Sequence, residues 1–356
     1  MTTDTPDTVF DTPPAAPVPR TVPFEFHGSG SEYFRIWIVN LLLSIITLGI
    51  YSAWAKVRRL RYFHGSTYLD GHCFDYHAEP VSILIGRLIT VGGYGLFVIA
   101  GNINPLLNLL LLPLLLAGLP WVIMRSRRFH LRMTSWRGLR FGFHGDYKGA
   151  FKAYVLWWLA AVFTVGILLP MFLQRRLTYL LDNSAYGSQR STFKVGAGPF
   201  YKLYGKVILL ALGLLVGVAF IGVVLRLLTS SQTMASMGSV VLGVLGMAAA
   251  LLIVAVYQAS VLNLAFGSLQ IGPHRVQSTL KGSELAGVLI TNAVLIVLTL
   301  GLYSPWAKVR LLRYQLQHTQ LIAEGDLGEF TASATPDDSK ALGDEISDFF
   351  DVDFGI

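Results

Sequence analysis

The sequence predicts an α-helical polytopic membrane protein with three internal repeats and short cytoplasmic β-hairpin pieces. The chain of 356 residues is 53% hydrophobic and only 14% charged, whereas about a quarter of the residues of a soluble domain are charged. A sixteen-residue pattern near the N-terminus returns near the C-terminus. Seven apolar segments are long enough to cross, or nearly cross, about 30 Å of hydrocarbon: 34–54, 83–101, 105–124, 151–172, 207–228, 239–257 and 285–306.

The recurring pattern is the strongest guide to domain organisation. TLGIYSAWAKVRRLRY at 47–62 returns as TLGLYSPWAKVRLLRY at 299–314, with thirteen of sixteen positions identical. A weaker middle copy keeps Phe-His-Gly at 143–145 and a glycine at 166, but it lacks the Tyr-Ser-x-Trp-Ala-Lys run. Since repeats dictate architecture, we expect a membrane domain at 24–323, with repeats at about 24–82, 141–200 and 269–323 joined by helix pairs at 83–124 and 207–257.

Within each repeat, a strand-like piece is expected to precede an apolar helix with an aromatic and basic exit. The residues after the exit alternate around a glycine turn, which suits a β-hairpin. Residues 1–23 are rich in Thr, Pro and Asp, so we expect a disordered lead-in and no cleavable signal peptide. Residues 324–356 form an acidic C-terminal tail, because ten of the chain's 21 acidic residues lie there.

These motifs resemble those of the YjgN-like family, which comprises bacterial inner-membrane proteins grouped as a domain of unknown function. The resemblance is carried by the two Trp-Ala-Lys-Val-Arg runs, the Phe-His-Gly pieces and the closing FFDVDFGI, and it covers about residues 24–356. It implies a multi-pass protein of the bacterial cytoplasmic (inner) membrane. It brings no catalytic residue and no substrate.

Two membrane topologies remain open, and both place the C-terminus in the cytoplasm. If all seven segments cross, basic loops lie on both sides of the membrane. If 34–54, 151–172 and 285–306 re-enter or lie at the interface, only two helix pairs cross. The external loops are then 102–104 and 229–237, which carry no charge. The positive-inside rule favours four spans, whereas the length of the other segments favours seven.

Three polar residues are candidate intramembrane sites: Asn40, Asn292 and Arg87. The two asparagines occupy equivalent positions, nine residues before a glycine, and an amide in an apolar helix must find a partner. We expect the amides to pack helices together, with ligand contact as the alternative. Arg87 lies about a turn inside the second segment, where it can snorkel to the headgroups or pair with a phosphate.

Aromatic and basic residues at the two repeat exits are candidate interfacial lipid anchors, because such residues gather at anionic membrane surfaces. They are Trp54, Lys56, Arg58, Arg59, Arg61, Trp306, Lys308, Arg310 and Arg313. The expected partners are therefore the lipid bilayer and its anionic headgroups. The tail interleaves acidic and apolar residues, and Phe349, Phe350 and Phe354 are expected to dock on the protein or on a protein partner.

Several function classes are excluded by what the motifs lack. The single Cys73 excludes an intramolecular disulfide and a cysteine cage for a metal. No metal-ligand spacing, catalytic triad or nucleotide-binding fingerprint can be found, so we expect no enzyme, no cofactor and no metal. The excess of basic residues flanks the membrane segments, where retention of positive loops in the cytoplasm explains it, so we expect no nucleic-acid partner. The remaining hypotheses are a transporter or channel for a small or lipid-like solute, and a membrane-embedded scaffold or assembly factor.

Overall fold

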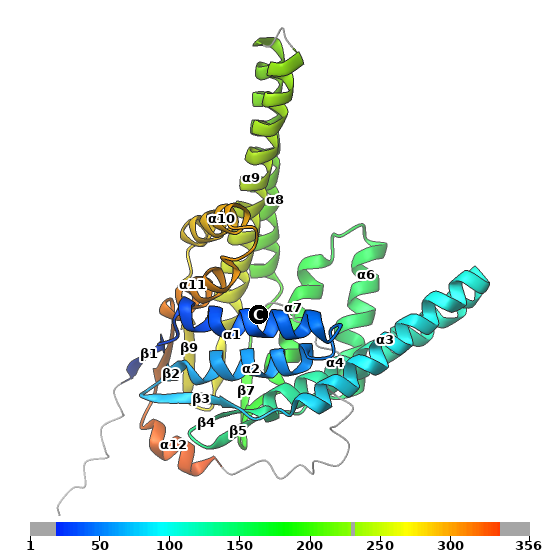
Figure 1. The fold of residues 1–356 in the computed structure, drawn as a ribbon. Coiled ribbons are helices and arrows are strands. Elements are labelled where there is room, and N and C mark those ends of the chain that lie inside the picture. The colour runs from blue at the N-terminus through cyan, green and yellow to red at the C-terminus, as the bar shows by residue number, and fades with distance from the viewer. Residues whose placement is uncertain (1–18, 229–231, 335–356) are drawn as a thin grey trace, which may run out of the picture.

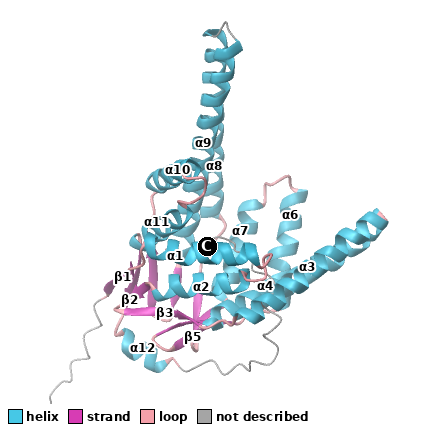
Figure 2. Ribbon diagram, viewed as in Figure 1, coloured by secondary structure: helices cyan, strands magenta, loops and turns pink. Residues whose placement is uncertain are grey.

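The computed structural model describes residues 19–228 and 232–334. Within these ranges, ten short strands lie together at one side of the molecule, and long helices extend away from them (Figure 2). The strands are β1 Arg20–Phe26, β2 Thr67–Leu69, β3 His72–Tyr76, β4 Thr134–Trp136, β5 Leu139–Phe143, β6 Ser184–Tyr186, β7 Gln189–Phe193, β8 Leu269–Ile271, β9 His274–Ser278 and β10 Thr319–Ala323.

Two-residue turns join the strands in pairs. The β2–β3 turn is Asp70-Gly71 and the β4–β5 turn is Arg137-Gly138, and both central residues of each turn have positive φ. Such a turn matches the right-handed twist of the flanking strands. Gly187 and Gly272, also at positive φ, open the β6–β7 and β8–β9 turns. The local sequence therefore encodes four hairpins.

The hairpins close into one antiparallel barrel, in the order β1-β10-β9-β8-β7-β6-β5-β4-β3-β2 and back to β1. Closure depends on β1, in which Arg20 to Pro23 pair with Ala323 to Gln320 of β10, while Phe24 to Phe26 pair with Leu69 to Thr67 of β2. The predicted fold class, a mainly helical protein with separate hairpin pieces, is therefore wrong. An isolated hairpin has unpaired backbone groups along its two outer edges. In the closed barrel every such edge pairs with a neighbouring strand, so no edge is left exposed.

Helical insertions separate the strands that tight turns do not join. The helices are α1 Gly30–Ile46, α2 Ser52–Gly65, α3 Pro80–Ile103, α4 Pro105–Met133, α5 Tyr147–Phe151, a π-helical turn at Lys152–Leu156, α6 Trp157–Phe163, α7 Leu169–Asp182, α8 Gly198–Leu228, α9 Gln232–Phe266, α10 Gly282–Leu298, α11 Ser304–Gln317 and α12 Leu327–Ser333. Because neighbouring strands are antiparallel, all insertions leave from one end of the barrel, here named the helix end. The tight turns and α12 lie at the other, the turn end.

Three of the insertions are helical hairpins with the same tip. In each, a threonine side chain (Thr47, Thr164 or Thr299) donates to the carbonyl four residues earlier and accepts from the backbone N–H four residues later. The next residue has positive φ and is almost fully exposed: Leu48 94%, Val165 93% and Leu300 94%. The apolar segments 34–54, 151–172 and 285–306 thus each turn back on themselves.

Four helices of the described chain are long and apolar enough to cross a membrane: Pro80–Ile103, Pro105–Met133, Gly198–Leu228 and Ser236–Phe266. They form two antiparallel pairs that project from the barrel in different directions (Figure 1). At the chain ends, β1 already begins at Arg20, inside the segment expected to be a disordered lead-in. The start of the acidic tail folds as α12.

Candidate functional site

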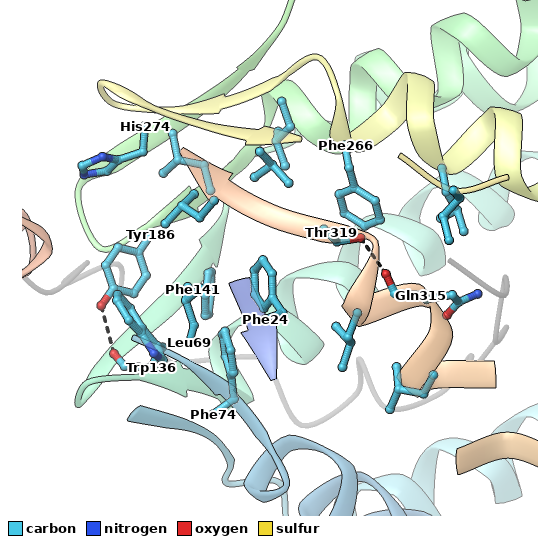
Figure 3. Close-up of a pocket in the computed structure, with 18 of the residues that line it drawn as sticks. Phe24, Leu69, Phe74, Trp136, Phe141, Tyr186, Phe266, His274, Gln315 and Thr319 are labelled. Atoms are coloured by element: carbon cyan, nitrogen blue, oxygen red, sulfur yellow. Dashed lines mark hydrogen bonds between the residues drawn. The ribbon is translucent and has the colours of Figure 1, made fainter. Parts of the chain in front are cut away.

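The inner faces of the strands supply the candidate site. Successive strand residues point to opposite sides of a sheet, and β9 follows this rule: His274, Val276 and Ser278 are buried, whereas Arg275 and Gln277 are exposed. The inward positions of the other strands are mostly large and apolar. The largest rings among them are Phe24, Phe74, Trp136, Phe141 and Tyr186 (Figure 3).

These side chains enclose a cavity of about 610 Å³. A barrel of eight strands is just wide enough for its own side chains to fill, and diameter grows with strand number. Ten strands therefore leave space that even five aromatic rings do not occupy. The volume lies within the range of small-molecule sites, about 300–1,000 Å³.

Few polar side chains line this cavity, and the two hydroxyl groups among them are already hydrogen-bonded. The Tyr186 hydroxyl donates to the Trp136 carbonyl at 2.9 Å, and burial raises the pKa of Tyr186, so this hydroxyl stays a donor. The Thr319 hydroxyl donates to the Gln315 carbonyl at 2.8 Å (Figure 3). The lining therefore suits an apolar chain or ring rather than a charged group.

The two ends of the cavity differ. At the helix end it is bounded by α9, through Leu262 and Phe266, and by α11, through Leu312 and Leu316. At the turn end α12 covers it, with Leu327 buried in the same core and Phe330 packed against it. The cavity thus faces the long apolar helix α9 at one end and is covered by α12 at the other.

One buried histidine stands out among the lining residues. His274 is 2% exposed, and its Nδ1 accepts the backbone N–H of Glu324 at 3.2 Å, which leaves the proton on Nε2. Nε2 is buried with no hydrogen-bond partner among the described residues. Burial lowers the pKa of His274, although Glu324 opposes the shift, so the ring is neutral near pH 7 and offers one N–H donor.

The candidate intramembrane amides hold helical hairpins together. Asn40 Nδ2 donates to the Ala55 carbonyl at 3.4 Å and Asn292 Nδ2 donates to the equivalent Ala307 carbonyl at 3.2 Å. Each bond joins the two helices of one hairpin, α1 to α2 or α10 to α11. Arg310 also approaches Asn292, at 3.5 Å from Oδ1.

The candidate lipid anchors divide into groups with different surroundings. Arg61 donates to the carbonyls of Tyr76 and Ala78, and Arg313 donates to that of Gly28, so both connect a hairpin to the barrel rim. Arg58 donates to the Tyr51 hydroxyl at 3.1 Å.

Trp54 and Trp306 each stack on the tyrosine three residues before them. Lys56, Arg59, Arg87 and Lys308 line one separate pocket. Phe349, Phe350 and Phe354 lie outside the described residues.

The barrel lining was not found by sequence reasoning. Its signal is present in the sequence, since each short strand alternates and Phe24, Phe74 and Phe141 occupy like-facing positions in three different strands. No group of three or more potential metal ligands occurs among the described residues. The best-formed site among the described residues is therefore the barrel cavity, which can hold an apolar molecule.

Comparison with known proteins places the chain in a bacterial context. The model of a family described as "Bacterial protein of unknown function (DUF898)" matches residues 21–349. Proteins named inner membrane protein YjgN are 31% identical over 163 residues in Escherichia coli O157:H7, 35% over 137 in Escherichia coli K12 and 30% over 152 in Salmonella typhimurium. These matches cover 46%, 38% and 42% of this chain and 40%, 33% and 36% of those relatives. No solved structure matches.

Proposed function

The chain belongs to the bacterial family DUF898, which confirms the resemblance found in its sequence motifs, and from this premise we propose that it holds an apolar, lipid-like molecule in its barrel and exchanges it with the inner membrane. The relatives' name, inner membrane protein, and the four apolar helices support a bilayer as the source. The cavity lining, which is aromatic and aliphatic with few polar atoms, is the observation that carries the proposal.

The energetics favour exchange with a bilayer over capture from water. Burying one CH₂ group from water gains about 0.8 kcal/mol, so a long chain taken up from water is held tightly. Lipid tails are as apolar as a leucine-lined cavity, so transfer from bilayer to barrel is close to neutral. A site built this way loads and unloads without a large barrier from the hydrophobic effect. This fits the transport hypothesis, whereas a solidly packed barrel fits a scaffold.

We propose a topology that brings the helix end of the barrel to the membrane. The two long helix pairs cross, and the three helical hairpins enter one leaflet by their apolar tips. The α3–α4 connection at 103–105 carries no charge, while Arg125, Arg127, Arg128 and Arg132 lie in the barrel-proximal part of α4. The positive-inside rule then places the barrel in the cytoplasm, with the α3–α4 connection outside.

The proposal is tested by native mass spectrometry of the protein purified in a mild detergent. We expect one bound molecule per chain, with the mass of a fatty acid, a phospholipid or an isoprenoid lipid, that survives gas-phase removal of the detergent micelle. It should also be displaced by an excess of a fatty acid of different mass. A protein that is free of adducts, and that takes up no added fatty acid, contradicts the proposal.

A further inference from the structure

One polar group in the barrel wall is buried without a hydrogen-bond partner. His274, the first residue of β9, is 2% exposed and belongs to the lining of the cavity (Figure 3). Its Nδ1 accepts the backbone N–H of Glu324, so the ring proton is on Nε2, which has no partner among the described residues. Nearly all buried polar groups are hydrogen-bonded, and an unpaired one costs free energy. A free donor in a cavity wall indicates that the ligand supplies an acceptor.

The imidazole ring is held in position from two sides. The backbone of Glu324 binds Nδ1, and the Glu324 carboxylate pairs with Arg275, on the outer face of β9, at 2.7 Å. On the other side, the Phe330 ring of α12 meets the imidazole at 84°, with 4.3 Å between the ring centroids. Contact with an aromatic ring is a second-order interaction beside an N–H···O bond, so it does not satisfy the donor. The donor is therefore fixed at the turn end of the lumen.

The surroundings of His274 favour an uncharged acceptor. None of the described lining residues is Lys, Arg, Asp or Glu, and burial lowers the pKa of His274, so the ring is neutral near pH 7. A carboxylate or phosphate here would be buried without a countercharge, which is costly. A hydroxyl would bring a proton that needs an acceptor of its own, whereas a carbonyl oxygen only accepts. A carbonyl group therefore fits this position best.

The position of His274 also says which part of the ligand carries the carbonyl. The turn end is covered by α12 through Leu327 and Phe330, whereas α9 and α11 bound the opposite end of the cavity. A ligand whose carbonyl reaches His274 extends its apolar remainder toward α9. A diacyl phospholipid fits poorly in this orientation, because its charged headgroup follows its ester carbonyls and would lie against α12.

We propose that the barrel selects an uncharged lipid with a carbonyl group at one end, and that His274 Nε2 donates to that carbonyl oxygen. This inference rests on the proposed function, since it concerns the same lumen, and adds the chemical class of the ligand. Apolar burial gives affinity for any lipid tail. The single donor discriminates, because a ligand without the acceptor leaves the N–H buried and unpaired. His274 is thus a specificity-determining residue.

The test offers the protein two molecules that differ in one carbonyl group: a long-chain methyl ketone and the alkane with the same number of carbons. Detergent-purified protein is incubated with an equal mixture and separated from free ligand by size exclusion. Bound molecules are then extracted and quantified by gas chromatography, with protein-free micelles as the background. The readout is the ratio of bound ketone to bound alkane, which cancels differences in total uptake.

Three variants make the comparison specific. His274→Leu removes the donor, His274→Gln keeps an N–H near the position of Nε2, and Gln315→Leu removes a polar lining side chain at the opposite end of the cavity. We expect the ketone-to-alkane ratio to fall at least about tenfold in His274→Leu. It should stay within about threefold of wild type in His274→Gln and within about twofold in Gln315→Leu, because each keeps a donor at the turn end.

The outcomes separate this inference from the proposed function. An unchanged ratio in His274→Leu, or an equal fall in Gln315→Leu, overturns the role of His274, while uptake of the alkane still supports the apolar lumen. Failure of wild-type protein to take up either molecule overturns the proposed function itself.

Infrared spectroscopy of an isotope-labelled ketone bound to wild-type protein decides the question without any variant. We expect the carbonyl stretch at a lower frequency than in an alkane solvent, because the oxygen accepts a hydrogen bond, and an equal frequency overturns the proposal. A fatty acid methyl ester and a prenylated benzoquinone, each used in place of the ketone, then distinguish an ester from a quinone as the source of the carbonyl.

Discussion

Filling the barrel with two indole rings should empty it of its bound molecule. Leu269 on β8 and Val276 on β9 are buried and face the cavity, so Leu269→Trp with Val276→Trp places new rings in the space that the ligand would occupy. We expect the fraction of protein carrying an apolar adduct in native mass spectrometry to fall at least tenfold. Overpacking a filled core costs about 1–3 kcal/mol, and an existing cavity reduces that cost, so the variant should fold.

The matched control carries the same two rings on the outside of the same strands. Gln270 and Gln277 are exposed and lie next to the inward-facing Leu269 and Val276 in the sequence. The Gln270→Trp, Gln277→Trp variant should therefore retain the adduct at wild-type occupancy. Equal occupancy in the two double variants shows that the molecule binds elsewhere, for instance between membrane helices, and the proposed function fails.

Cysteine labelling in intact cells should give an all-or-none contrast between two positions. In a Cys73→Ser background, Asn102→Cys lies beside the α3–α4 connection and Ser188→Cys lies in the β6–β7 turn, and both native residues are exposed. An impermeant thiol reagent added outside is expected to modify Asn102→Cys rapidly and to leave Ser188→Cys unmodified. The reason is that the proposed topology puts the uncharged connection outside and the barrel, with its neighbouring basic residues, in the cytoplasm.

Permeabilised cells provide the control for this contrast. Both cysteines should then react at similar rates, which shows that neither is shielded by folding. Modification of Ser188→Cys in intact cells places the barrel on the outer side, and the proposed topology is then wrong.

Local features of the fold were within reach of the sequence, whereas its closure was not. The glycine turns at 71, 138, 187 and 272 and the alternation around them predicted strands close to where they lie. Pairing between hairpins depends on contacts such as that of Arg20 with Ala323, and no local pattern records a partner 303 residues away. Each short strand contributes only a few residues, so closure of the barrel depends on the pairings of all the strands together.

The helical hairpins show a similar limit. Mean hydropathy measures how apolar a segment is and does not detect a bend within it, so 34–54 could be read as a span. The bend is encoded by Thr47, Leu48 and Gly49: the threonine side chain bonds both flanking helices, and Gly49 adopts the positive φ that glycine tolerates best. The same three-residue pattern at 164–166 and 299–301 is what could have indicated the turns.

For the candidate sites, sequence reasoning selected charged and amide residues and passed over the lumen. Charges in apolar segments are conspicuous because they are rare there, and four of the selected cations do meet in one pocket. An apolar lining residue such as Phe141 has the same composition signal as an ordinary core residue. Only the three-dimensional arrangement shows that its ring, besides packing against Phe74 and Tyr186, also borders a space.

Photo-crosslinking in the native membrane tests the central claim, that the barrel lumen takes up a molecule from the bilayer. Cells are fed a fatty acid with a diazirine near its methyl end, irradiated, and the protein is digested for peptide mapping. The account predicts crosslinks on inward-facing barrel residues such as Phe141, Leu269 and Val276, in addition to the membrane helices. Crosslinks confined to α3, α4, α8 and α9, with none on the strands at any dose, would contradict it.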